Sequence, residues 1–221
     1  MKKTAVRGNG KVDPGTGARI VAVGIGNLIH ADDGLGVHAI ERLRLDPRVP
    51  DPVTLIDGGT YGLELLNYIS DSTYLLLLDA IDVGEKPGTL VRMANEELRG
   101  LPCAASVHQV GLADLLATLP LVSTVPRETV LLGVVPLSTD WGTELTAPVA
   151  KALGPLLDAA AGQLVRWSAE IAAGRDVAAA DSWNGTVRAP VSRSVASRMM
   201  LRIAGGGGSN VPGHSRKNHQ Q

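Results

Sequence analysis

The octapeptide TYLLLLDA at residues 73–80 constrains the fold more than any other stretch, because it is apolar on both faces of an extended chain. A strand with one face in water alternates apolar and polar residues, whereas a strand covered by helices on both faces is apolar throughout. The octapeptide therefore predicts a strand buried in the middle of a parallel sheet.

Apolar runs alternate with helical periodicity on both sides of this strand, which predicts right-handed strand–helix–strand units. The predicted fold is α/β, with three layers: a doubly wound, mostly parallel twisted sheet and helices on both of its faces. Strands are predicted at 19–24, 53–56, 73–80, 88–94 and 129–136, and helices at 33–45, 62–69, 95–100, 109–118 and 146–172.

Composition divides the chain into three parts. Residues 1–18 carry four Lys/Arg and one Asp, and their glycines and proline interrupt regular structure. Residues 19–174 carry ten Lys/Arg and nineteen Asp/Glu, so this middle part is acidic. Residues 175–221 are basic and lack the apolar content to fold alone. We expect a flexible extension at 1–18, one α/β domain at 19–173 and a disordered basic Gly/Ser/Arg-rich tail at 174–221.

Several classes of protein are disfavoured. The basic ends hold one aromatic residue, Trp183, and no repeated Arg/Gly or Lys pattern, which argues against nucleic-acid binding. No apolar run approaches the ~18–20 residues that span a bilayer, and no apolar segment follows the N-terminal lysines. Cys103 is the only cysteine, so a reducing compartment is expected. We expect a cytoplasmic monomer that binds neither nucleic acid nor a membrane.

The turn GIGNLIHADDGLGV at residues 24–37 resembles a phosphate-binding loop at its start and then departs from it. The third glycine of a dinucleotide fingerprint is replaced by Ile29. A bound phosphate would also meet Asp32 and Asp33, and like charges in a partly dry crevice cost on the order of a few kcal/mol. The turn therefore argues against a nucleotide.

Two interpretations of Asp32 and Asp33 remain. They could cap the following helix, one as its N-cap and one in its first turn. They could instead belong to a site, because Asp79 ends the most apolar strand, at the edge where open α/β sheets bind ligands. His108 lies just before another helix. Asp33, Asp79 and His108 would then meet at one edge, and two carboxylates with an imidazole can bind a divalent transition metal.

Five segments occur in an order and at a spacing that resemble one known family, the hydrogenase maturation proteases, over about residues 19–172. These endopeptidases trim a C-terminal extension from the large subunit of nickel-iron hydrogenases once nickel is in place. The segments are GIGNLIHADDGLGV (24–37), IDGGTYGLELL (56–66), LLLDAID (76–82), SVHQVGLADLL (106–116) and LLGVVP (131–136).

The resemblance implies a site and a substrate. Asp33, Asp79 and His108 match the family's metal-binding and catalytic positions, and Asp57-Gly58-Gly59 matches a motif expected to bind the substrate chain. The first ligand is Asp here, where the family has Glu or Asp, so the backbone must lie slightly closer to the metal. The nickel would be supplied by the substrate, the hydrogenase large-subunit precursor. Hydrolysis could be of the aspartic type or metal-dependent.

Alternatives remain for the function and for individual residues. The chain could be a nickel chaperone without peptidase activity, a Rossmann-type nucleotide-binding regulator, or a peptidase in which Cys103 is the nucleophile. His30 could be an auxiliary ligand, while His38 is expected at the surface. Trp141 and Trp167 are expected to cover the core or a docking surface, and Glu64 and Asp82 to be solvated.

Overall fold

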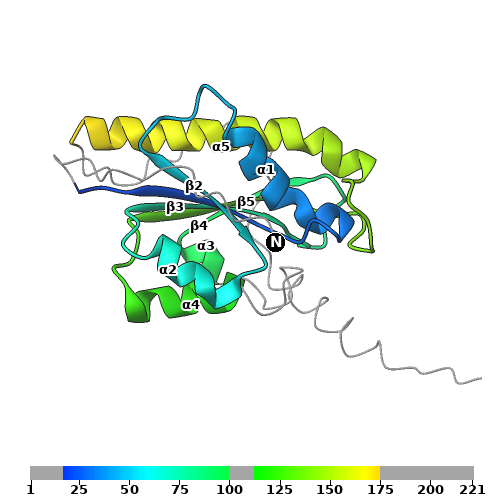
Figure 1. Ribbon diagram of the computed structural model, residues 1–221, viewed down its shortest axis with the longest axis horizontal. Coiled ribbons are helices and arrows are strands. Elements are labelled where there is room, and N and C mark those ends of the chain that lie inside the picture. The colour runs from blue at the N-terminus through cyan, green and yellow to red at the C-terminus, as the bar shows by residue number, and fades with distance from the viewer. Residues whose placement is uncertain (1–16, 100–111, 175–221) are drawn as a thin grey trace, which may run out of the picture. The chain divides into compact units, whose positions relative to one another are not determined.

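The computed structural model describes residues 17–99 and 112–174, in which five strands alternate with helices (Figure 1). The strands are β1 (Ile20–Ile25), β2 (Val53–Gly59), β3 (Tyr74–Ala80), β4 (Leu90–Ala94) and β5 (Glu128–Val134). The helices are η1 (Ala31–Gly34, 3₁₀), α1 (Leu35–Leu43), η2 (Gly62–Leu65, 3₁₀), α2 (Leu66–Ile69), α3 (Glu96–Arg99), α4 (Leu112–Val122) and α5 (Ala147–Ala172).

The five strands form one sheet in the order β2-β1-β3-β5-β4. β3 lies at its centre and every one of its residues is buried, as the apolar octapeptide predicts. β1, β2, β3 and β5 run parallel, whereas β4 is antiparallel to β5. The link from β3 to β4, residues 81–89, is too short for a parallel crossover, which takes a dozen or more residues. The predicted mostly parallel sheet is confirmed.

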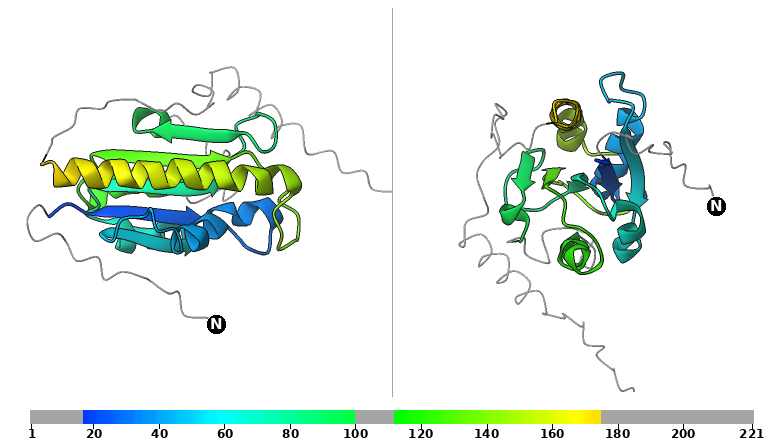
Figure 2. Two further views of the ribbon diagram at one scale, coloured as in Figure 1. Left: turned by 90° about the horizontal axis from the view of Figure 1, so that it is seen from above. Right: turned by 90° about the vertical axis from the view of Figure 1, so that its left-hand side faces the viewer.

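Helices cover both faces of the sheet. Figures 1 and 2 show α1 and α5 on one face and α2, α3 and α4 on the other. The core under α1 and α5 consists mainly of Leu, Val, Ile and Ala, together with the fully buried Trp167. The predicted three-layer α/β arrangement is therefore confirmed, and Trp167 belongs to the core.

Two glycines let α1 lie unusually close to the sheet. A Cβ atom added to Gly36 would lie 2.2 Å from the carbonyl oxygens of both Ile25 and Leu78. A Cβ atom added to Gly24 would lie 2.1 Å from the Gly36 carbonyl oxygen. Backbone packs directly on backbone here, so the start of α1 is fixed against the ends of β1 and β3 with no side chain between them.

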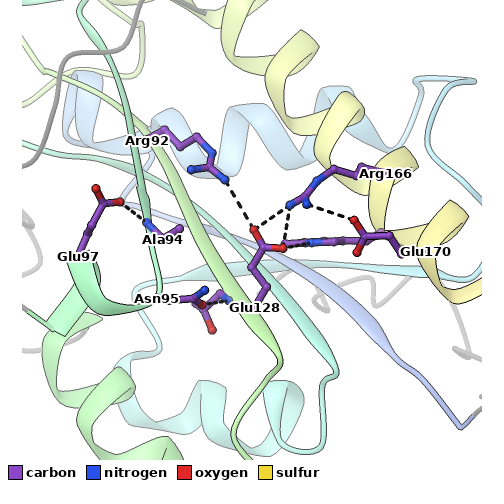
Figure 3. Close-up of polar contacts among 9 residues, drawn as sticks. Arg92, Ala94, Asn95, Glu97, Glu128, Arg166 and Glu170 are labelled. Atoms are coloured by element: carbon purple, nitrogen blue, oxygen red, sulfur yellow. Dashed lines mark hydrogen bonds and ion pairs between the residues drawn. The ribbon is translucent and has the colours of Figure 1, made fainter. Parts of the chain in front are cut away.

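At the other end of the sheet, polar side chains attach α5 to the strands (Figure 3). Both carboxylate oxygens of Glu128 accept hydrogen bonds from Arg166 at 2.8 Å, and one also accepts from the indole nitrogen of Trp167 at 2.7 Å. Arg92 on β4 forms an ion pair with Glu128 at 3.6 Å. The Trp167 ring stacks on Tyr74 with 5.1 Å between ring centroids. Glu128 thus joins β4, β5 and α5.

Several predicted boundaries are wrong. The helix predicted at 109–118 continues to Val122, the strand predicted at 129–136 ends at Val134, and the helix predicted at 62–69 is a 3₁₀ turn, η2, until Leu65. The strand predicted at 53–56 continues through Gly59, because Asp57 and Gly59 still pair with β1. The helix predicted at 33–45 starts with the 3₁₀ turn η1 and becomes α-helical only at Leu35. Residues 1–16 of the predicted extension and residues 175–221 of the predicted tail lie outside the described residues. Among the described helices, none is both long and apolar enough to span a bilayer.

Candidate active site

Asp33 lies in η1, at the turn that follows β1. Its side chain is 3% exposed, and its Oδ2 accepts a hydrogen bond from the backbone N–H of Asn27 at 3.1 Å. Behind it, Gly26 has a φ of +148°, and a Cβ atom there would lie 2.0 Å from the Asp33 carbonyl oxygen. Gly26 is required for this close contact, which fixes the backbone that carries Asp33.

Asp79 is the last residue but one of β3 and is completely buried. Its Oδ1 accepts a hydrogen bond from the backbone N–H of Ala80 at 2.8 Å. Because β1 and β3 are hydrogen-bonded neighbours, with Gly24 opposite Leu78, the turn that carries Asp33 after β1 and Asp79 at the end of β3 lie at the same edge of the sheet. The Gly36 contact with the Leu78 carbonyl brings the turn that carries Asp33 directly against β3.

The Asp57-Gly58-Gly59 segment ends β2, on the other side of β1. Asp57 accepts a hydrogen bond from the Gly59 N–H at 3.1 Å, and Gly59 has a φ of +43°. The Gly59 carbonyl in turn accepts a hydrogen bond from the Gly26 N–H at 2.9 Å. The segment thus lies beside the turn that carries Asp33. Its assignment to substrate binding stays a prediction.

Asp32 does not cap α1, so the capping interpretation is wrong for this residue. It is completely buried, and Gly34 is the N-cap of α1 without a side-chain hydrogen bond. The Asp32 carboxylate accepts four hydrogen bonds from the segment between β5 and α5. The donors are the N–H of Leu137 (2.8 Å), the N–H of Ser138 (3.1 Å) and both the N–H (2.7 Å) and hydroxyl (2.8 Å) of Thr146.

Asp32 therefore fixes the loop at residues 135–146 against the loop at residues 26–34. Thr146 is the N-cap residue of α5, so this carboxylate also fixes the start of that helix. The sequence holds no local signal for this role, because the partners lie 105 to 114 residues away along the chain.

His30 and Trp141 form a pair beside this contact, with ring centroids 4.7 Å apart. The His30 Nδ1 lies 3.0 Å from the Thr139 carbonyl oxygen. A carbonyl only accepts, so Nδ1 carries a proton and Nε2 has the lone pair in the neutral ring. That tautomer suits the predicted auxiliary ligand, which stays a prediction. His38 is half-buried, with Nε2 inside the protein, and so lies deeper than expected.

The third predicted ligand, His108, lies outside the described residues, as does Cys103. Among residues 17–99 and 112–174, no three His, Cys, Asp or Glu side chains are grouped so as to hold a metal ion. The structure therefore brings two members of the predicted triad, Asp33 and Asp79, to neighbouring strand ends. Glu64 and Asp82 are exposed, as expected for solvated charges.

Two buried carboxylates at one sheet edge can serve two kinds of chemistry. Carboxylate oxygens bind divalent metals, and a carboxylate can accept a proton from water as a general base. Desolvation strengthens either interaction, because charges attract more strongly in a medium of low dielectric constant. The fold and this edge therefore define an α/β protein with two buried carboxylates, Asp33 and Asp79, at the carboxyl ends of neighbouring parallel strands.

Comparison with known proteins agrees with this class. The family model for hydrogenase maturation protease (HycI) matches residues 37–163. The hydrogenase expression/formation protein HupD of Bradyrhizobium diazoefficiens is 39% identical over 156 residues, which cover 69% of this chain and 81% of HupD. The hydrogenase 2 maturation protease of Escherichia coli is 37% identical over 143 residues, covering 63% of this chain and 87% of that protein.

Solved structures give the same result. The hydrogenase maturating endopeptidase HybD from Escherichia coli superposes with a TM-score of 0.62 at 34% identity, covering 68% of this chain and 93% of HybD. A [NiFe] hydrogenase maturation protease HybD from Thermococcus kodakarensis superposes with a TM-score of 0.58 at 26% identity, covering 66% of this chain and 99% of that protein. The chain belongs to the hydrogenase maturation protease family. It is a peptidase that acts in hydrogenase maturation.

Proposed function

We propose that this peptidase removes a C-terminal extension from the large-subunit precursor of a nickel-iron hydrogenase after nickel has been inserted. The observation that carries the proposal is the pair of buried carboxylates, Asp33 and Asp79, on adjacent strand ends of a hydrogenase maturation protease. His108 is proposed as the third member of this site, on the basis of the motif at residues 106–116.

In this proposal nickel belongs to the substrate. Two carboxylates and an imidazole can complete the coordination of a divalent ion that the precursor already holds. A precursor without nickel lacks this interaction, binds more weakly and is spared from cleavage. The Asp57–Gly59 segment lies beside the Asp33 turn and is proposed to bind the backbone of the substrate chain.

Hydrolysis requires that a water oxygen attack the carbonyl carbon of the cleaved peptide bond. The water loses a proton, the carbon–nitrogen bond breaks, and the departing nitrogen receives a proton. Either Asp33 or Asp79 can accept the proton from water and return it to the nitrogen. Alternatively, nickel in the substrate lowers the pKa of the attacking water.

The proposal is tested by incubating the purified full chain with nickel-loaded precursor and following the loss of C-terminal mass by mass spectrometry. We expect Asp33→Ala and Asp79→Ala to reduce processing at least about 100-fold, since each removes a group that binds metal or transfers a proton. A matched control is Asp71→Asn, because Asp71 is exposed and lies just before the opposite end of β3.

Processing at the parental rate by either alanine variant would overturn the site assignment. Asp33→Asn and Asp79→Asn, made separately, distinguish the two routes to hydrolysis. An amide keeps an oxygen for the metal but cannot accept the proton. Partial activity in both variants therefore favours the nickel route, and complete loss in one of them favours that carboxylate as the base. Tight binding of nickel-loaded precursor by the parental chain without cleavage would instead indicate a nickel chaperone.

A further inference from the structure

Four exposed apolar side chains lie on two adjacent loops at the edge of the sheet that holds the candidate site. Leu28 and Ile29 belong to the loop after β1 and are 43% and 48% exposed. Leu137 and Trp141 belong to the loop after β5 and are 57% and 79% exposed. Figures 1 and 2 show these loops side by side beyond the ends of β1 and β5. We call these four residues the apolar rim.

Hydrogen bonds fix the two loops of the apolar rim to each other. The Ile29 carbonyl accepts from the Gly142 N–H at 3.1 Å, and the Ala31 N–H donates to the Gly142 carbonyl at 2.7 Å. The Trp141 ring also packs against His30. The apolar side chains therefore project from backbone that is already ordered, so a partner would lose little free energy in ordering them.

The charge at this edge is one-sided. In the described loops that follow β1, β2, β3 and β5, one basic residue, Lys86, is present. The accessible carboxylates in and beside these loops are Asp57 near the end of β2, Glu64 in η2, and Asp82, Glu85, Asp140 and Glu144. The opposite edge carries charges of both signs. Its basic residues are Arg19, Arg44, Arg48 and Arg127, and its acidic residues are Asp46, Asp51, Asp71, Glu128 and, after the antiparallel β4, Glu96 and Glu97. A partner that fits this edge needs apolar and basic side chains together.

We propose that the apolar rim and the surrounding carboxylates bind a segment of the hydrogenase large-subunit precursor that carries both apolar and Lys/Arg side chains. This inference rests on the proposed function. Asp33 follows Leu28 and Ile29 by five and four residues, so a chain bound on the rim lies next to the candidate site. Exposed tryptophan is a frequent anchor of interfaces, and acidic surroundings select a basic partner and speed its approach.

The test measures binding and processing of nickel-loaded precursor by the full chain. Trp141→Ala is expected to weaken binding about 10-fold to 30-fold, the effect of losing an interface anchor. Leu45→Ala is the matched control, because Leu45 is 80% exposed but lies before β2 at the opposite edge, and it should bind like the parent. The double variant Glu85→Gln/Glu144→Gln should weaken binding of the precursor up to about five-fold at low salt. Its affinity should also change less with salt concentration than that of the parent.

Unchanged binding by Trp141→Ala would overturn the proposal, and so would parental affinity that does not fall between 50 and 300 mM salt. Acrylamide quenching of Trp141 fluorescence, taken as the difference between the parent and Trp141→Ala, tests other occupants of the rim in the free chain. Protection from quenching that grows with protein concentration indicates a second copy, and protection that is independent of concentration indicates another segment of this chain. Either result overturns the proposal, because Trp141 is 79% exposed when nothing covers it. Binding without cleavage by the parent contradicts only the proposed function, because the binding assay does not depend on processing.

Discussion

Replacing Asp32 with alanine should lower the free energy of unfolding by about 4 kcal/mol, because four donors lose their acceptor at once. Asp32 is completely buried and accepts from the N–H groups of Leu137, Ser138 and Thr146 and from the Thr146 hydroxyl. A buried donor left without a partner costs about 1–3 kcal/mol. Water can enter the space left by the side chain, so the lower limit, about 1 kcal/mol for each of four donors, applies.

Asp32→Asn provides a finer test of the same geometry. Three of the four bonds end on Oδ2, from Leu137, Ser138 and the Thr146 hydroxyl, and one ends on Oδ1, from the Thr146 N–H. An asparagine oxygen placed at Oδ2 keeps the first three, but its amide nitrogen then faces the Thr146 N–H, donor against donor. We expect a loss of about 1–2 kcal/mol, smaller than for alanine.

Urea denaturation of the three proteins gives the free energies, and hydrogen exchange shows where the structure opens. Exchange should speed up first at Leu137, Ser138 and Thr146, the backbone donors of the contact. The reasoning is refuted if the asparagine variant is as stable as the parent, or if exchange accelerates equally across the sheet.

The remaining predictions concern packing and pH. Gly36→Ala should destabilise the chain by about 1–3 kcal/mol or more, because its Cβ atom would lie 2.2 Å from two backbone carbonyl oxygens. Thermal unfolding measures this loss of stability. The control is Gly162→Ala on α5, where no atom lies within 4 Å of the added Cβ. Burial, with the nearby negative charge of Glu170, raises the pKa of Tyr74 above its ordinary value of 10.0. The neutral phenol is thus favoured in the folded chain, so this stabilisation is complete below pH 10 and is lost as the pH rises through the folded-state pKa. Urea denaturation from pH 8 to 11 should show a steeper alkaline loss for the parent than for Tyr74→Phe, and equal slopes would contradict the assignment.

The loop at residues 135–146 connects structure with the proposed function. Asp32 fixes it in place, and the same loop carries Leu137 and Trp141 of the apolar rim. Weakening the Asp32 contact should therefore impair precursor binding even though Asp32 itself is buried. Asp33, the next residue, is proposed to act on the substrate directly, so neighbouring carboxylates serve separate roles.

The sequence determined the architecture because hydrophobic periodicity is a local property of the chain. A continuous apolar run placed β3 at the centre of the sheet, and alternating periods placed helices on both sides. The order of motifs was sufficient to indicate the protease family, and it predicted a site at the ends of β1 and β3. The orientation of β4 followed only from the pairing of strands, since a short apolar run has no preferred direction.

Only the tertiary structure separated Asp32 from Asp33. The two residues have the same side chain, neighbouring positions and the same local signals for capping. Their difference comes from donors at residues 137, 138 and 146, which the fold brings against Asp32 from more than 100 residues away. The two tryptophans differ in the same way, since Trp141 in the loop after β5 is 79% exposed and Trp167 on α5 is fully buried. Side-chain roles of this kind depend on which distant groups become neighbours, and local sequence patterns do not encode that.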